Sequence, residues 1–126
     1  MKTEISTGTP ATETLVRVAA DAILDKKGED LVVLDLTEVT PLTDFFIICT
    51  GNNSRQIKTI AEEVEAKVKE AFGVSPRSVE GLGDMSWVLI DYVDFVVHIF
   101  LPDTRSYYSL ERLWGDAVRM DLPAQV

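Results

Sequence analysis

Cysteine and histidine are almost absent from this chain of 126 residues, which contains one of each, Cys49 and His98. A single cysteine excludes an intrachain disulfide, and one Cys with one His excludes a zinc site of the usual Cys/His kind. Cys49 lies in an apolar run, where a free cysteine usually behaves as a small buried hydrophobic residue. We therefore expect a reduced, cytoplasmic setting.

Positive charge is also scarce, because 12 Lys and Arg face 21 Asp and Glu, for a formal net charge of −9. This balance argues against direct or sequence-specific binding to nucleic acid, which needs clustered cations, and it suits a basic protein partner. No apolar run approaches the ~18 residues of a membrane span. The N-terminus lacks the hydrophobic block of a secretory signal. No membrane association is expected.

The length fits one domain, with a polar segment at each end. Residues 1–11, with Gly8 and Pro10, predict a flexible N-terminal arm. Residues 12–120 predict a single domain, and residues 121–126, with Pro123, predict a frayed tail.

Hydrophobic periodicity predicts elements in the order α-β-β-α-β-β-β-α. Helices are expected at residues 12–27, at 54–72 and from Asp103 or Thr104, as the capping residue, to about Met120. Strands are expected at 31–36, 44–50, 76–79, 87–92 and 95–100. The loop between the first two strands is too short for a helical crossover, which makes them antiparallel neighbours. The predicted fold is α/β (α+β), a mixed five-stranded sheet with flanking helices.

The strands at 87–92 and 95–100 form a predicted hairpin with two unlike faces. A two-residue turn at Val93–Asp94, or a longer loop over Tyr92–Phe95 that relieves strain at Val93, pairs Asp91 with Val96, Leu89 with His98 and Trp87 with Phe100. One face is aliphatic and resembles a core: Val88, Ile90, Val97 and Ile99. The other is mixed: Trp87, Leu89, Asp91, Val96, His98 and Phe100. The mixed face has the composition of a protein interface, or the last helix covers it, and the sequence alone favours neither.

Three enzymatic interpretations are weaker than their structural alternatives. Residues 51–54 before a helix could cradle a phosphate, but they lack the P-loop pattern and are ordinary turn and N-cap residues. Asp91 and Asp94, with Asp35 and Asp44, could bind the magnesium of a nucleotidyltransferase-like enzyme, yet no phosphate-binding lysine accompanies them. His98 could act as a general base, but no serine or cysteine of the sequence lies in a nucleophile motif that it could activate. We expect no enzyme activity, metal or cofactor, with a magnesium-dependent nucleotidyltransferase-like enzyme as the alternative.

The start of the last helix carries a second group of polar and aromatic residues. They are Arg105, Tyr107, Tyr108, Glu111 and Arg112. Tyr108 and Arg112 share one helix face at four-residue spacing. These residues form either a solvated helix surface or an extension of the mixed hairpin face.

Several segments, in this order and spacing, resemble the ribosomal silencing factor family, also called RsfS or Iojap-like. They are LVVLDL at 31–36, DFFIICTGNNSRQ at 44–56, Glu80-Gly81, WVLIDY at 87–92, VVHIF at 96–100 and RSYYSLERLW at 105–114. The resemblance covers about Leu15 to Ala117. Val93 departs from it, since family members usually carry Gly there, and this puts the turn geometry in question.

The resemblance implies a nucleotidyltransferase-like mixed sheet without known transferase activity. It also implies a translation repressor that binds the large ribosomal subunit through large-subunit ribosomal protein L-fourteen and sterically blocks subunit joining. Members can associate as homodimers. The expected partner-binding residues lie on the hairpin and the start of the last helix: Trp87, Leu89, Asp91, Tyr92, His98, Phe100, Pro102, Arg105 and Tyr108.

Overall fold

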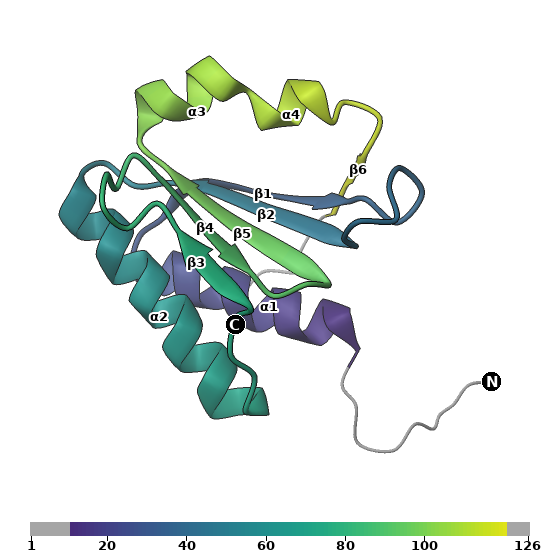
Figure 1. Cartoon of the computed structure of the whole chain (residues 1–126), viewed down its shortest axis with the longest axis horizontal. Coiled ribbons are helices and arrows are strands. Elements are labelled where there is room, and N and C mark those ends of the chain that lie inside the picture. Colours follow the sequence, from purple (N-terminus) through teal and green to yellow (C-terminus); the bar gives the residue numbers. More distant parts are fainter. Residues whose placement is uncertain (1–10, 121–126) are drawn as a thin grey trace.

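A computed structural model describes residues 11–120 and arranges them as a sheet between two helical layers (Figure 1). The predicted arm, apart from Ala11, and the predicted tail at 121–126 lie outside the described residues. None of the helices within 11–120 is long and apolar enough to cross a membrane. The elements are α1 (Thr12–Asp25), β1 (Glu29–Asp35), β2 (Phe45–Thr50), α2 (Ser54–Phe72), β3 (Ser78–Glu80), β4 (Trp87–Asp91), β5 (Phe95–Phe100), α3 (Pro102–Tyr108), α4 (Leu110–Leu113) and β6 (Val118–Arg119).

The sheet is mixed and has the strand order β3-β4-β5-β2-β1-β6. The predicted antiparallel pairing of β1 with β2 is confirmed, with Val33 opposite Ile47. The central pair, β2 and β5, is parallel, and helix α2 and the strands β3 and β4 connect them along the chain. These two strands are apolar almost throughout because helices cover both of their faces.

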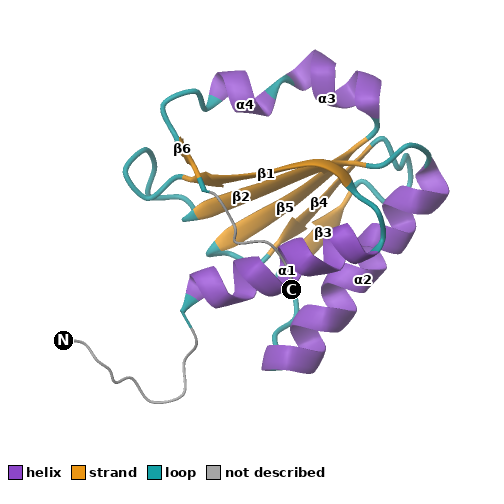
Figure 2. Cartoon of the chain, turned by 180° about the vertical axis from the view of Figure 1, so that it is seen from behind, coloured by secondary structure: helices purple, strands orange, loops and turns teal. Residues whose placement is uncertain are grey.

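Helices α1 and α2 cover one face of the sheet and form the main core with it (Figure 2). The aliphatic hairpin face, Val88, Ile90, Val97 and Ile99, is fully buried in this core, as predicted. Helix α2 begins as its sequence indicates, since Asn53 Oδ1 accepts a hydrogen bond of 2.8 Å from the Gln56 N–H. Residues 51–54 therefore serve as turn and N-cap, the structural interpretation of that segment.

The short helices α3 and α4 cross the opposite face and cover part of the mixed hairpin face (Figure 1). Leu110 packs there in a second, smaller core with Leu34, Leu36, Ile48 and Phe100. Trp87, Phe46 and Trp114 are partly buried against this cluster. The last helical segment thus covers one part of the mixed face and leaves another part open.

The C-terminal segment differs from the single long helix that was predicted. Ser109 adopts a left-handed conformation (φ 51°) that separates α3 from α4, and the new turn carries Leu110 onto the sheet. Pro102 takes the first helical position after Leu101, so neither Asp103 nor Thr104 caps the helix. Val118–Arg119 then pairs with β1, which makes a sheet of six strands instead of five. A strand of two residues is too short to produce a recognisable pattern.

Candidate partner-binding surface

The hairpin has the predicted register and a two-residue turn. Asp91 pairs with Val96, and Leu89 pairs with His98. Val93 lies at φ 76°, a conformation that is unfavourable for a β-branched residue. The Asp91 side chain supports the turn, because its Oδ1 accepts a hydrogen bond of 2.7 Å from the Val93 N–H.

Asp91 also forms an ion pair with Arg77, whose Nη2 lies 2.6 Å from Asp91 Oδ2. Partial burial raises the pKa of Asp91, but the hydrogen bonds from Arg77 and Val93 outweigh it and hold the pKa below its usual value. Both oxygens of this carboxylate therefore have partners within the hairpin region. Across residues 11–120, no three His, Cys, Asp or Glu side chains gather closely enough to hold a metal ion.

His98 is the only histidine and is 3% exposed. Three aromatic rings neighbour its ring, with centroid distances of 4.5 Å to Phe46, 5.9 Å to Trp87 and 6.1 Å to Phe100. Trp87 donates a hydrogen bond of 3.1 Å from its indole nitrogen to His98 Nδ1. Burial lowers the pKa of His98 to about 4, so the imidazole is neutral at physiological pH.

The open part of the mixed face forms a groove of about 400 Å³, which we call the sheet-face groove. Its lining comes from strands β2, β3, β4 and β5, from the residue before β3, from the hairpin turn, from the loop between β1 and β2, and from the end of α4. The lining residues are Thr40, Leu42, Thr43, Phe46, Arg77, Glu80, Leu89, Asp91, Val93, Val96, His98 and Trp114. Leu42 is 81% exposed at its rim.

Several lining residues were not predicted as site residues, notably Leu42, Thr43 and Phe46. They join the site because β2 lies beside β5 in parallel, which places Phe46 next to Val96. Two strands so far apart in the chain give no local pattern of their pairing. The apolar residues Val39 and Leu42 in the loop between β1 and β2 were the one available signal.

Three predicted contact residues have contacts within the fold. Phe100 is fully buried under the helical segment, and Tyr92 is buried on the opposite face, stacked on Phe95 at 4.6 Å. Burial raises the pKa of Tyr92. Phe100 has no exposed surface and Tyr92 is 7% exposed, so both side chains pack mainly within the fold, and their contact with a partner stays a prediction. The third residue is Arg105.

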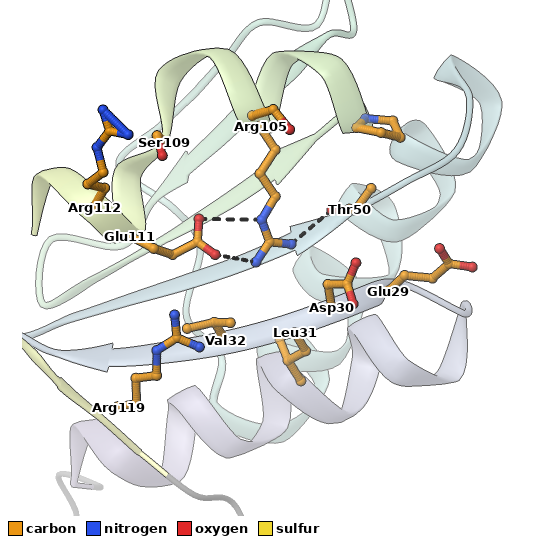
Figure 3. Close-up of a pocket in the computed structure, with 12 residues that line it drawn as sticks. Glu29, Asp30, Leu31, Val32, Thr50, Arg105, Ser109, Glu111, Arg112 and Arg119 are labelled. Atoms are coloured by element: carbon orange, nitrogen blue, oxygen red, sulfur yellow. Dashed lines mark hydrogen bonds and ion pairs between the residues drawn. The ribbon is translucent and has the colours of Figure 1, made fainter. Parts of the chain in front are cut away.

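Arg105 fastens α3 and α4 to the sheet (Figure 3). Its Nη2 lies 2.8 Å from Glu111 Oε2, its Nη1 donates to Thr50 Oγ1 at 2.8 Å, and the side chain is 12% exposed. Burial raises the pKa of Glu111, but Arg105 outweighs it and keeps the pKa below its usual value. The ion pair lies in a cavity of about 900 Å³ between β1 and the helices, beside Arg112 and Arg119. Arg105 therefore positions the helices that border the mixed face.

The remaining predicted residues lie at or beside the surface. Leu89, Asp91 and His98 line the sheet-face groove. Trp87 stacks on Phe100 at 4.9 Å and contacts the Tyr108 ring at 4.7 Å, and Tyr108 is 49% exposed. The structure thus joins the hairpin face to Tyr108 on α3. Pro102 is also exposed, but it lines the cavity that holds Arg105.

Comparison with known proteins gives consistent matches over nearly the whole chain. Residues 9–126 match the family model described as "Ribosomal silencing factor during starvation". The ribosomal silencing factor of Bacillus subtilis is 42% identical over 110 residues, which cover 87% of this chain and 92% of that protein. That of Halalkalibacterium halodurans is 44% identical over 108 residues, 86% of this chain and 92% of that protein. A crystal structure of a Chromobacterium violaceum protein superposes with a TM-score of 0.81 and 38% identity, covering 91% of this chain and 92% of that one.

Proposed function

The chain belongs to the ribosomal silencing factor family, and from this membership we propose that it is a translation repressor that binds the large ribosomal subunit in the cytoplasm. In this proposal the contact is large-subunit ribosomal protein L-fourteen. The bound chain occupies space that the small subunit needs, and so it prevents subunit joining. This role requires a binding surface and no chemistry.

The observation that supports the proposal best is the apolar surface left open on the mixed face. Leu42 and Val93 are exposed at the rim of the sheet-face groove, and Leu89 is half-buried in it. Tyr108 extends this surface past Trp87 onto α3. A neighbouring set of exposed apolar and aromatic side chains around a groove is typical of a protein interface.

The charge of the molecule supports a basic partner. The formal net charge is −9, and the rim of the groove carries Glu80 and Asp91 against one cation, Arg77. A ribosomal protein with a basic surface would be attracted at long range, which speeds the encounter. An RNA backbone would be repelled.

Co-sedimentation with isolated large subunits tests the proposal. We expect the wild-type chain to sediment with the subunits and Leu42→Asp to bind about 30-fold or more weakly, as expected for an interface residue whose loss costs ~2 kcal/mol. Leu42 is highly exposed, so the variant should fold. Leu24→Asp is the matched control, because Leu24 is 49% exposed on α1, across the sheet. Absence of wild-type binding, or equal binding by Leu42→Asp, would contradict the proposal.

The second step of the proposal concerns subunit joining. Addition of the wild-type chain to large subunits should reduce the formation of complete ribosomes from added small subunits on sucrose gradients. Leu42→Asp should have little effect at the same concentration, whereas Leu24→Asp should act as the wild type does. If the chain binds large subunits and complete ribosomes still form in full yield, steric exclusion is the wrong mechanism.

A further inference from the structure

The described residues contain three buried side-chain atoms with no hydrogen-bond partner: Thr43 Oγ1, Tyr92 Oη and His98 Nε2. Two of these residues, Thr43 and His98, line the sheet-face groove. They are 9% and 3% exposed, although buried polar atoms in proteins are nearly always hydrogen-bonded. The groove therefore concentrates unused hydrogen-bonding capacity in an apolar setting.

Trp87 determines which hydrogen bond His98 can make. Its indole N–H donates to His98 Nδ1 at 3.1 Å, so Nδ1 must be an acceptor without a proton. The neutral imidazole then carries its proton on Nε2. Nε2–H is consequently a donor, and it requires an acceptor such as a carbonyl or carboxylate oxygen.

The nearest aromatic ring is a poor substitute for that acceptor. Phe46 lies edge-to-face with His98 at a centroid distance of 4.5 Å. An N–H to ring contact is a second-order interaction compared with a hydrogen bond to oxygen. An oxygen acceptor would therefore satisfy His98 Nε2–H better than a neighbouring ring could.

The remaining lining indicates the kind of molecule that fits. Leu89, Val96 and Trp114 offer an apolar wall, which suits an aliphatic or aromatic side chain. The rim has two carboxylates, Glu80 and Asp91, and one cation, Arg77, so a phosphate backbone is disfavoured. A protein segment meets these requirements, because its main chain supplies carbonyl oxygens beside apolar side chains.

We propose that the sheet-face groove receives a protein segment of the large ribosomal subunit, with a carbonyl oxygen accepting from His98 Nε2–H and a main-chain group hydrogen-bonded to the Thr43 hydroxyl. This inference rests on the proposed function. An apolar side chain of the same segment packs against Phe46, Leu89 and Val96. Nε2 is shielded in the free chain, so entry of the segment displaces a side chain that lines the groove.

Thr43→Val tests the inference, because valine keeps the shape of threonine and removes the hydroxyl. Removal of an unpartnered buried hydroxyl should leave the melting temperature unchanged or higher. Binding to isolated large subunits should nevertheless weaken about 5-fold or more, and Thr43→Ser should restore it. Thr59→Val on α2, whose hydroxyl donates to the Arg55 carbonyl, is the matched control and should bind as the wild type does. Unchanged binding by a folded Thr43→Val would overturn the inference.

Two His98 variants provide a second test, which distinguishes the role of Nδ1 from the role of Nε2. In His98→Asn the amide can still accept from Trp87 but does not reach the Nε2 position, whereas His98→Gln places an N–H donor near that position. Both should be folded at pH 7 by circular dichroism. We expect His98→Gln to bind large subunits at least 5-fold more tightly than His98→Asn. Equal binding by the two variants would contradict a donor role for Nε2.

Other outcomes distinguish this inference from the proposed function. If the wild type does not bind large subunits, both are wrong. If it binds and Thr43→Val binds equally well, only the inference is wrong. If protein-free ribosomal RNA binds with the affinity of the subunit, or if Thr43→Val changes self-association by light scattering instead of subunit binding, the occupant is not the protein segment proposed and the inference fails.

Discussion

At the scale of the residue, His98 makes the stability of the fold depend on pH. Burial lowers its pKa to about 4 from an ordinary value of 6.5. Above pH 6.5 both the folded and the unfolded chain hold it neutral. As the pH falls from 6.5 toward 4, the unfolded chain gains a proton that the folded chain does not, so stability is lost, up to roughly 3 kcal/mol.

We therefore expect the wild type to lose stability relative to His98→Gln between pH 7 and pH 4. Urea unfolding of both proteins at several pH values measures the difference. Glu65 acts in the opposite direction, since burial and Glu62 raise its pKa. It is present in both proteins and cancels from the comparison. A difference that stays constant between pH 7 and pH 4.5 would show that His98 is not the responsible group.

Gly81 and Gly83 are close in sequence, but only Gly81 has a backbone conformation and surroundings that exclude a side chain. Gly81 has φ 92°, and a Cβ there would clash with the Trp87 carbonyl oxygen. Gly81→Ala should lower the free energy of unfolding by at least about 2 kcal/mol, by clash and by strain. A Cβ added at Gly83 would have no other atom within 4 Å, so Gly83→Ala should change the free energy of unfolding by less than about 0.5 kcal/mol. Chemical denaturation measures both, and equal effects would contradict the constraint at Gly81.

At the scale of the element, the hairpin contains a strained turn. Val93 has φ 76°, where an L-residue with a branched Cβ is unfavourable. Val93→Gly should raise the free energy of unfolding by about 0.5–1 kcal/mol, the relief of strain less the added freedom of the unfolded chain. Asp94→Gly is the control: it adds the same freedom to the unfolded chain but relieves no positive φ, so it should lower the free energy of unfolding. A decrease in stability for Val93→Gly in thermal unfolding would show that the turn is not strained.

The elements also show which parts of the fold a sequence can predict. The hairpin register followed from strict alternation, which sorts Val88 and Ile90 from Trp87 and Leu89 whatever the turn conformation. The break at Ser109 could not be predicted, because serine has no preference for the left-handed region and the residues on both sides favour a helix. It exists because Leu110 and Trp114 pack on the sheet.

The same limit applies to the site. Composition left the mixed face open between a contact surface and a face covered by the last helix; in the structure Leu89, Asp91 and His98 line the groove, while the helical segment covers Phe100. The hydrophobic periodicity of a strand does not show which part of it a distant segment will cover. Here α3 and α4 cover one end of β5 and leave the other end open. For this reason Phe100, on the same face as Leu89, is buried, and Arg105 is turned inward toward Glu111.

At the scale of the whole molecule, the net charge of −9 should govern how quickly the chain finds its partner. The rate of association with large subunits should fall by about an order of magnitude as salt rises from low to physiological and higher concentrations, since salt screens the attraction. The dissociation rate should change much less. Surface plasmon resonance at several salt concentrations measures both rates. An association rate that is constant or rises with salt would show that the partner surface is not basic.

The parallel pairing of β2 with β5 at the centre of the sheet affects how the chain folds during its synthesis. Phe45 pairs with Phe95 and Thr50 with Phe100, although synthesis finishes β2 long before it begins β5. A nascent chain therefore carries β2 with one unpaired edge until Phe100 has been added. Pairing of such distant segments is slow, and an open strand edge invites aggregation. Refolding of the complete chain should accordingly be limited by the docking of β5, and shorter nascent fragments should depend on chaperones.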